Sequence, residues 1–418
     1  MRDNGLIPGL FRDEHGKIVS VLCKTFGVAH IAIAEDLVKD TFLTALETWE
    51  SNGIPANPTA WLYAVAKNKA RDYFRRRSLF SEKIAPAILS TDASAADGAG
   101  DYELDLSDKN INDSQLQMIF TICNPMIPVD AQVGLALRIL CGFGIEEIAE
   151  AFLTSKETIN KRLFRAKEKL RAENLRVEAL SGTEIDERLD PVLATLYLLF
   201  NEGYASSTQE RALRKDLCIE AMRLTYFLAE NEATNKPQVN ALLSLMCFHS
   251  SRFEAREGEA GPILYDDQDR SLWNEELIAK GNHYLIESAK GHVLSKYHLE
   301  ASIAYWHCTK RDVEGKWEKI LQLYNQLLQV EYSPIAALNR TYALFRAQGN
   351  EPAIAEAEKL SLTGNHLYHT LLGRLYSGLD NPVSLKHYRT ALGLAKTSRD
   401  RAVIESAMNA VQSRSASS

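Results

Sequence analysis

Apolar residues return at spacings of three and four along almost the whole chain, as in the series Val38, Phe42, Ala45 and Trp49. This period places them on one face of an α-helix, whereas the strict alternation typical of β-strands is nearly absent. The pattern therefore predicts an all-α protein. No apolar run approaches the roughly 20 residues that a membrane-spanning helix needs, and the first residues lack the apolar stretch of a secretory signal. We expect a cytoplasmic protein with no membrane partner.

The helical pattern is interrupted twice, which divides the chain into three blocks. Residues 78–114 are acidic and rich in small side chains, and such a segment buries too little apolar surface to order itself. We expect a flexible acidic linker there, between helical domains at 1–77 and 115–180. A second boundary near Ser181 precedes the apolar run PVLATLYLLF, so residues 185–418 are expected to form a separate all-helical domain.

Charge is distributed unevenly along the chain. The 418 residues are 45% hydrophobic and 25% charged, as in soluble globular proteins, and the net charge of −7 argues against a protein that coats nucleic acid by bulk charge. Two short segments, 61–77 and 156–171, nevertheless each carry a net charge of +5, which the acidic linker masks in the total. Two basic helices joined by an acidic tether indicate local contacts with nucleic acid.

Residues 144–173 have the pattern of a helix-turn-helix. Leu153 and Thr154 turn the chain, and Thr154 with Glu157 three residues later fits a capping box that opens the second helix. The expected inner faces are Ile145, Ile148, Ala149 and Phe152 in the first helix and Ile159, Leu163, Ala166 and Leu170 in the second.

The outer face of that second helix carries hydroxyls and long cations. Cations meet phosphates, and the first turn of a helix reaches base edges in a major groove. A solvated basic face on an ordinary helix pair is the alternative, but the preceding helix, the short turn and the cap together favour binding to duplex DNA. The residues expected to contact DNA are Ser155, Lys156, Thr158, Lys161, Arg162 and Arg165.

The earlier basic segment, WLYAVAKNKARDYFRRR, differs because aromatic side chains are interleaved with its cations. Aromatic rings beside a cationic track suit a single strand, since stacking supplies about 1 to 3 kcal/mol per base. Trp61, Val65 and Tyr73 also fit the spacing of a core stripe, so at least half of the aromatics are expected to be structural. The four rings are Trp61, Tyr63, Tyr73 and Phe74.

Three segments together resemble the extracytoplasmic-function (ECF) sigma factors of bacterial RNA polymerase. AEDLVKDTFLTALETW is similar to the sigma-2 helix that docks on the polymerase clamp, and PTAWLYAVAKNKARDYFRRR to the adjoining helix that melts and reads the −10 element. The helix-turn-helix and the residues before it resemble the sigma-4 domain, which reads the −35 element. The resemblance covers about Leu10 to Glu173. It implies two partners: core RNA polymerase, through its β′ clamp and β flap, and promoter DNA.

The resemblance implies a polymerase contact on the outer face of the helix that holds AEDLVKDTF. Acidic side chains and one lysine would make this contact, with two apolar neighbours packed behind or beside them. The residues concerned are Glu35, Asp36, Lys39 and Asp40, with Leu37 and Val38 as the apolar neighbours.

The resemblance also implies contacts with −10 DNA, which is read as a melted strand. The Gly/Pro/Asn loop 52–57 falls where family members capture a flipped base, a task that suits turn-rich backbone; a plain surface turn is the alternative. The residues implied to contact this strand are Asn52, Asn57, Trp61, Asn68, Arg71, Asp72, Arg75, Arg76 and Arg77.

The last block resembles a branch of the family with a long C-terminal helical extension, through LYLLFNEGYASS, DQDRSLWNEELIAKG and HLEASIAYWHC. Residues 122–125, Ile-Cys-Asn-Pro, depart from the Cys-Cys-His-Pro string of that branch, so no metal or redox role is expected there. Segments starting at Asn350 and Asp380 repeat with an offset of 30 residues. The repeat predicts stacked helix pairs of the tetratricopeptide (TPR) kind from about residue 298, either as a scaffold or as a surface that binds a ligand or protein.

Catalytic and cofactor motifs are poor. The chain holds no P-loop, G-x-G-x-x-G or G-x-S-x-G sequence, and its six cysteines form no C-x-x-C pair, so we expect buried thiols, no cofactor and no enzyme activity. His366 and His369 have a chelating spacing but lack a third ligand in register. The acidic cluster 266–269 is expected to cap the following helix, with Asp269 at or near its N-cap, rather than to bind a metal.

We therefore predict a dissociable promoter-recognition subunit with a regulatory helical-repeat extension. One alternative is a stand-alone helix-turn-helix regulator that senses a ligand or partner through the repeats. The N-terminal block argues against it, because a simple regulator does not need such a block. A repeat-containing enzyme or adaptor unrelated to DNA would require both basic helices to be accidental.

Overall fold

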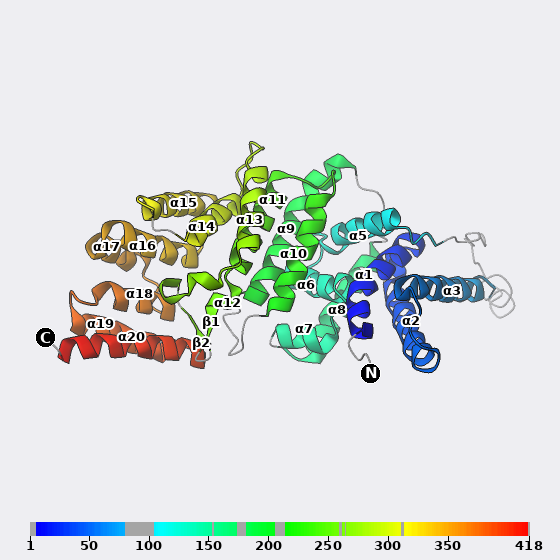
Figure 1. Cartoon of the computed structure of the whole chain (residues 1–418), viewed down its shortest axis with the longest axis horizontal. Helices are drawn as coiled ribbons and strands as arrows, with labels where there is room; N and C mark the ends of the chain where they lie inside the picture. Colours follow the sequence, from blue (N-terminus) through cyan, green and yellow to red (C-terminus); the bar gives the residue numbers. More distant parts are fainter. Residues whose placement is uncertain are drawn as a thin grey trace. The chain divides into compact units, whose positions relative to one another are not determined.

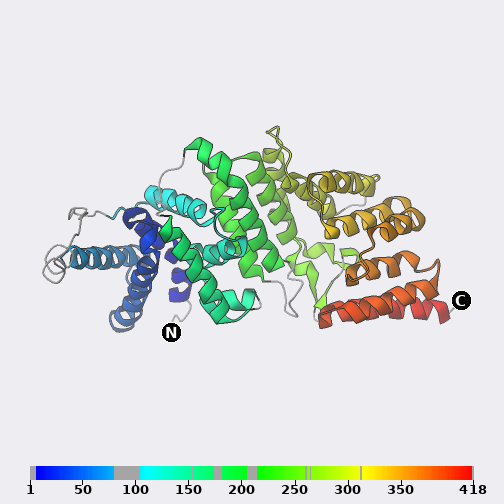
Figure 2. The same ribbon diagram turned by 180° about the vertical axis from the view of Figure 1, so that it is seen from behind.

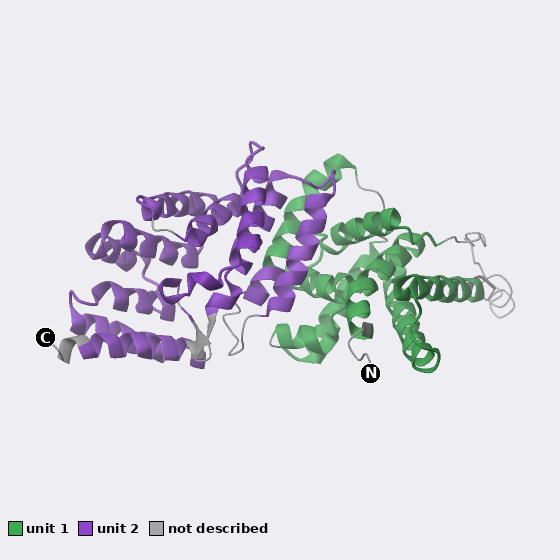
Figure 3. Ribbon diagram, viewed as in Figure 1, with its two compact units in different colours: residues 1–198 green, residues 199–418 purple. Residues whose placement is uncertain are grey.

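The computed structural model describes most of the chain, which Figures 1 and 2 show coloured along the sequence. The chain divides into two compact units, residues 1–198 and 199–418 (Figure 3). Most of the expected acidic linker lies outside the described residues. The described residues are 6–79, 104–152, 154–173, 181–204, 214–258, 261–263, 265–310 and 313–416.

Unit 1 begins with three long helices and a short connecting turn. The stripe Val38, Phe42, Ala45 and Trp49 is buried as the apolar period predicts, which orients the second long helix on the first. The elements are α1 (Leu6–Phe26), η1 (Val28–His30), α2 (Ile31–Asn52) and α3 (Pro58–Leu79).

The second part of unit 1 contains the helix-turn-helix. The first helix of this part, which begins at Asp108, starts inside the segment 78–114 that was expected to be a linker. Ser107 caps this helix, and Ile111 anchors it because its side chain is buried at 3% exposure in an otherwise polar stretch. That helix packs against α1, so the described end of the linker is part of the folded unit. The elements are α5 (Asp108–Ile122), α6 (Val129–Leu135), η3 (Ala136–Leu140), α7 (Ile145–Ala151), α8 (Lys156–Ala172) and α9 (Gly182–Tyr204).

A close backbone approach joins the two parts of unit 1. A Cβ at Gly16 of α1 would lie 2.4 Å from the carbonyl oxygen of Leu140 at the end of η3. No other residue fits this distance, so α1 packs this closely against η3 only because position 16 is glycine. Unit 1 is therefore a single packed body, although the sequence predicts two domains in this region.

The regular elements in the described part of unit 2 are helices and one hairpin. Two strands of two residues each, β1 (Glu257–Gly258) and β2 (Gly261–Pro262), pair antiparallel. The first part of the unit packs around α11, which contacts α10, α13 and α14. The helices of this part are α10 (Lys215–Glu230), α11 (Pro237–Ser250), α12 (Phe253–Arg256), η4 (Tyr265–Asp267), η5 (Arg270–Leu272) and α13 (Glu275–Ser288).

The rest of unit 2 is a series of consecutive helix pairs, as the repeat predicts. Each helix from α14 to α20 contacts the next one along the chain, and α18, α19 and α20 lie side by side in both views (Figures 1 and 2). Gly349 and Gly378 follow helices with positive φ values of 91° and 84°, which glycine adopts readily. The helices are α14 (Lys296–Cys308), α15 (Lys316–Val330), α16 (Pro334–Gln348), α17 (Asn350–Leu360), α18 (His366–Tyr376), α19 (Asn381–Leu394) and α20 (Ser398–Ala416).

Two general expectations can be compared with this fold. All six cysteines are buried free thiols, as predicted. Within the described ranges, every helix is too short or too polar to cross a bilayer.

Candidate functional site

The second helix of the helix-turn-helix, α8, presents its polar face to solvent. Its apolar residues Ile159, Leu163, Ala166 and Leu170 are all buried, which confirms the predicted inner face. The cap differs from the expectation by one residue. The hydroxyl of Ser155, and not that of Thr154, accepts a hydrogen bond from the backbone N–H of Thr158 at 3.2 Å.

The lysine and arginine side chains on this face differ in their exposure and in their ion pairs. Lys161 and Arg165 are exposed and form no ion pair with any described residue. Lys156 is exposed too, but it pairs with Glu146 on α7. Arg162 is half-buried because its guanidinium lies 5.8 Å from the ring centre of Phe152 and 3.9 Å from a carboxylate oxygen of Asp130.

A basic groove of about 460 Å³ runs along α8. The sequence singled out four of its lining residues, but missed Asp130 on α6 and Lys169 on α8. Lys169 stands one helical turn after Arg165, so the i, i+4 spacing of the cations could have found it. The groove is lined by Pro128, Asp130, Ala131, Thr158, Lys161, Arg162, Arg165, Ala166 and Lys169.

The basic helix α3 separates its cations from its aromatic rings. Trp61 packs edge-on against Trp49, with ring centres 5.3 Å apart, and Phe74 stacks on Phe26 at 3.5 Å. The hydroxyl of Tyr63 donates a hydrogen bond to Glu14 at 2.5 Å. These three rings therefore make structural contacts, which agrees with the expectation that at least half of the four aromatics are structural. The polar side chains expected at DNA are exposed: Asn68, Arg71, Asp72, Arg75 and Arg76; the side chain of Arg77 lies outside the described residues.

The loop before α3 leaves Asn52 exposed but gives Asn57 a structural task. The side-chain oxygen of Asn57 accepts a hydrogen bond from the N–H of Ala60 at 3.0 Å, so it caps the start of α3. Gly53 has a positive φ of 81°, which sets the direction of the loop after α2. Ile54 beside it is 49% exposed.

Glu35 lies in the interior, and the expectation that it sits on the outer face of α2 is wrong. Its side chain is 4% exposed, and its carboxylate accepts a hydrogen bond from Arg138 of η3 at 2.9 Å and another from Lys167 of α8. Burial alone raises the pKa of Glu35, but the charges of Lys167 and Arg138 outweigh it and hold that pKa below its usual value. Glu35 therefore binds α2 to the helix-turn-helix segment.

The true outer face of α2 combines charge with exposed apolar surface. Asp36 and Asp40 are exposed, and Lys39 pairs with Asp36 at 3.1 Å, while Leu37 and Val38 are buried behind them as expected. Leu43 and Leu46 follow on the same helix at 54% and 48% exposure. Together with Lys39 they line a largely apolar cavity of about 730 Å³ between α2, α1 and the start of α7.

The histidines and aspartates whose spacing resembles a metal site make other contacts in the structure. His369 faces His387, with 3.0 Å between their Nδ1 atoms, and His366 faces Asp400, so the two histidines do not converge. Asp269 caps η5 by accepting the N–H of Ser271, as predicted. Over the part of the chain that the structure covers, no three His, Cys, Asp or Glu side chains gather into a metal site.

Comparison with protein families matches three parts of the chain. Residues 10–80 match the profile of Sigma-70 region 2, and residues 127–170 match that of Sigma-70, region 4. Residues 188–289 match a family of unknown function, DUF6596. The first two matches contain α2, α3 and α8, the helices whose exposed faces are described above.

Individual relatives agree with these matches. An uncharacterized protein of Rhizobium meliloti is 30% identical over 413 residues, which cover 97% of this chain and 95% of the relative. The ECF RNA polymerase sigma-E factor of Haemophilus influenzae is 29% identical over 134 residues, and that of Escherichia coli 27% over 137, covering 32% of this chain and 70% and 69% of those proteins. No solved structure matches the chain. The two sigma-70 regions and these sigma-E relatives show that the chain belongs to the ECF sigma factors of the sigma-70 family.

Proposed function

We propose that this sigma factor binds core RNA polymerase through α2, places α8 on the −35 duplex, and brings α3 and the loop before it to the melted −10 strand. The polymerase performs the phosphodiester chemistry. The C-terminal unit regulates these steps. The observation that carries the proposal is the presence in unit 1 of two exposed cationic helix faces, on α3 and α8, each backed by a packed apolar core.

The −35 contact follows from the geometry of α8. Lys161 and Arg165 are free to neutralise phosphates, since no described carboxylate holds them. Thr158 lies in the first turn, where a helix N-terminus reaches base edges. The carboxylate of Asp130 lies beside Arg162 in the groove. Its negative charge repels phosphates that approach this point, so it disfavours nonspecific anion binding there and favours DNA positions that contact the neighbouring cations.

The −10 contact uses the polar face of α3. Arg71, Arg75 and Arg76 form an exposed cationic track, which suits a strand backbone. Because Tyr63 and Phe74 are engaged by Glu14 and Phe26, the bases would stack on few rings of this helix. We propose that the exposed loop around Asn52 and Ile54 supplies the pocket for a flipped base instead.

The polymerase contact predicts a specific loss of binding. Changing Asp36 and Asp40 together to lysine should weaken co-purification with core polymerase, because both carboxylates are exposed beside the apolar residues Leu43 and Leu46. Reversal of charge at an interface places like charges together, which costs several kcal/mol. The far-ultraviolet circular dichroism should stay the same, since neither carboxylate supports the core.

A matched control is available in unit 2. Glu230 and Glu232 are exposed and form no ion pair with a described residue, so changing both to lysine alters net charge equally without touching α2. The control should co-purify like the unmodified chain. Equal retention of the α2 variant and the control on core polymerase would contradict the docking proposal.

The link between the sigma regions and the extension is a continuous helix. Helix α9 runs from Gly182 to Tyr204, and its first part is anchored inside unit 1. Arg188 donates to the carbonyl of Phe120 at 2.7 Å, and the hydroxyl of Thr195 donates to Gln132 at 2.7 Å. We infer that regulation by the C-terminal unit is transmitted through α9 to the helix-turn-helix.

This inference predicts that removing most of unit 2 changes transcription more than folding. A protein of residues 1–204 keeps α9 and its anchors, whereas a cut after Ser181 would also expose the apolar partners of α9. Run-off transcription by the 1–204 protein and by the full chain should differ severalfold at equal concentration, with −35 binding and helical content measured alongside. Equal transcription by both would show that the extension is a passenger.

A further inference from the structure

Unit 2 contains a cavity of about 350 Å³ between its first helices and the repeats. This volume suits a small molecule. The cavity walls come from α12, the segment around η4, and helices α14, α15 and α16. The residues that line it are Arg252, Arg256, Ile263, Tyr265, Gln268, His307, Trp317, Tyr324, Asn339, Tyr342 and Ala343.

Arg252 is buried here, and no carboxylate of the described residues forms an ion pair with it. The residue is 7% exposed, its Nε has no hydrogen-bond partner, and its Nη2 reaches only the hydroxyl of Tyr204 at 3.5 Å. Its guanidinium otherwise lies over the ring of Tyr265, 5.6 Å from the ring centre. Burying an unpaired charge is strongly unfavourable, so a buried arginine normally has a carboxylate or another anion beside it.

A second arginine adds to the positive charge of the cavity. The guanidinium of Arg256 stacks over the ring of Tyr204 at 4.0 Å. Neither Arg252 nor Arg256 forms an ion pair with a described residue. Two guanidinium groups therefore line the same cavity, and planar guanidinium groups recognise carboxylates and phosphates better than any other side chain.

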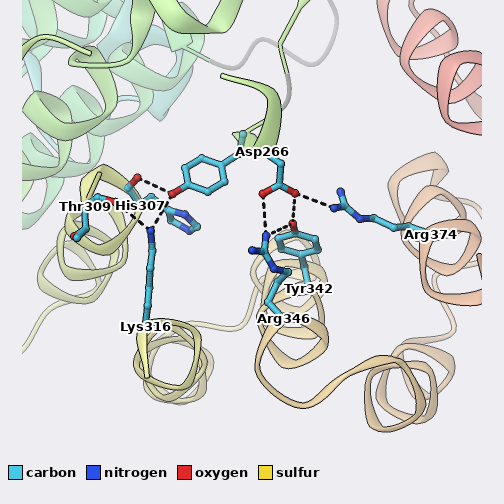
Figure 4. Close-up of polar contacts among 8 residues, drawn as sticks. Asp266, His307, Thr309, Lys316, Tyr342, Arg346 and Arg374 are labelled. Carbon is cyan, nitrogen blue, oxygen red and sulfur yellow. Dashed lines mark hydrogen bonds and ion pairs between the residues drawn. The ribbon is translucent and has the colours of Figure 1, made fainter. Parts of the chain in front are cut away.

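Asp266, which follows the lining residue Tyr265 in the sequence, is already neutralised by other side chains. Asp266 accepts hydrogen bonds from Arg346 and Arg374, both at 2.8 Å, and from the hydroxyl of Tyr342 at 3.0 Å (Figure 4). The hydroxyl of Tyr265, its neighbour in sequence, donates to the carbonyl of His307 at 2.9 Å. The carboxylate of Asp266 thus joins η4 to α16 and α18 and is not an ion-pair partner of Arg252.

Further polar atoms in the cavity wall also lack partners. The Oε1 atom of Gln268 and the Nδ1 atom of His307 are buried and make no hydrogen bond. Burial, reinforced by the charges of Arg252 and Lys316, lowers the pKa of His307 to about 3, so this imidazole is neutral at physiological pH. Orphaned buried polar atoms beside an unpaired guanidinium indicate a polar ligand that completes their hydrogen bonds.

The remaining walls are aromatic and flat. The rings of Trp317 and Tyr324 stand on α15, and Tyr342 stands on α16. Apolar and aromatic walls with a few convergent polar groups are typical of small-molecule sites.

We propose that this cavity binds a small organic anion, a carboxylate or phosphate ester carried on a flat apolar body, with Arg252 as its main contact. Arg256 and Gln268 complete the polar end of the site, and Trp317 and Tyr324 hold the apolar body. The proposal concerns unit 2 and does not depend on how unit 1 binds polymerase or DNA.

Three anionic probes and one neutral probe test this site on the full chain. Benzoate and phenyl phosphate present the two candidate head groups on the same ring, inorganic phosphate presents the head group alone, and benzamide presents the ring without charge. At a probe concentration about 100 times its Kd, binding should raise the thermal midpoint by about 5 °C. It should also change the tryptophan fluorescence, since Trp317 lines the cavity.

The comparison of benzoate with phenyl phosphate decides which head group the site prefers. Stabilisation by either of them, and little by benzamide, is the expected result. Equal stabilisation by benzamide, or no response to any of the three anions, would overturn the proposal.

The variant Arg252→Gln separates a ligand contact from a structural role. It should weaken binding of the preferred probe about 10- to 100-fold, which is the usual loss for a hydrogen bond to a charged group. Without probe, its thermal midpoint should equal or exceed that of the unmodified chain, because an unbalanced buried charge has been removed. Arg389→Gln, the same change at an exposed position of α19, should leave both properties unchanged.

The opposite pattern would contradict the assignment. If Arg252→Gln binds the probe as tightly as the unmodified chain, another group holds the anion. If Arg252→Gln does not fold, Arg256→Gln serves as the second variant, with a smaller expected loss because Arg256 is only half-buried. Unchanged probe binding in Arg256→Gln would then overturn the proposal.

Discussion

Replacing Glu35 with glutamine should lower the free energy of local opening in unit 1 by about 3 to 5 kcal/mol. The change keeps the shape of the side chain but leaves Arg138 and Lys167 without their shared carboxylate, and their side chains are only 11% and 21% exposed. Buried cations that lose their partner destabilise the folded state far more than the pair stabilised it. The expected loss should be visible as faster hydrogen exchange in α2 and α8.

The same helix provides the control for this prediction. Glu47 on α2 is exposed and forms no ion pair with a described residue, so Glu47→Gln should leave exchange unchanged. If Glu35→Gln exchanges as slowly as the control, the buried bridge does not hold α2 to the helix-turn-helix segment.

The pH dependence of this bridge has a defined sign. The pKa of Glu35 is lower in the folded chain than in the unfolded one, where a glutamate titrates at about 4.3. A depressed folded pKa adds stability above the unfolded value, and this contribution disappears as the pH falls through the folded pKa. Stability from the bridge should therefore be constant from neutral pH to about pH 5 and decline below about pH 4.

Changing Arg162 and Arg165 together to alanine should reduce −35 binding strongly. A cation that contacts phosphate adds about one unit to the salt slope of binding, and a base-reading side chain adds about 1 to 3 kcal/mol at particular base pairs. The double change should therefore lower affinity by at least about tenfold. The measurement is equilibrium binding to a −35 duplex at several salt concentrations, with the footprint recorded in parallel.

Two exposed arginines of unit 2 make a matched control for that measurement. Arg389→Ala with Arg401→Ala removes the same charge far from α8 in the sequence, and should leave the salt slope unchanged. Because Arg162 also contacts Phe152, circular dichroism of the α8 variant should confirm that the fold persists. A footprint and a salt slope that match the control would show that another surface reads the −35 element.

Helical periodicity predicts the elements but not every contact between them. The stripe on α2, the inner face of α8, and Ile148 and Ala149 of α7 could be predicted because local spacing determines which side of a helix is apolar, whereas Ile145 and Phe152 are only half-buried. Glu35 could not, since a glutamate in an acidic run looks exposed until Arg138 and Lys167, about 100 or more positions away, are known to lie beside it. Burial of such a charge depends on tertiary partners alone.

The linker and the extension show the same limit. The start of α5 could not be predicted because it lies in a polar stretch of the sequence. The residues that define it are the N-cap Ser107 and the buried Ile111. The cavity of unit 2 collects Arg252, His307 and Trp317 from separate helices, and no spacing in the sequence connects them. The one signal available was the acidic run 266–269, in which Asp269 caps a helix as predicted but Asp266 binds two arginines of the repeats.

Transcription from the region upstream of its own gene is the most direct test of the account. The full chain, mixed with core RNA polymerase and that DNA, should produce a run-off transcript that core polymerase alone does not make. The variant with Asp36 and Asp40 changed to lysine should produce little of it, while the Glu230 and Glu232 control produces the full amount. A chain that binds this DNA by itself but yields no transcript with core polymerase would contradict the account and indicate a stand-alone regulator.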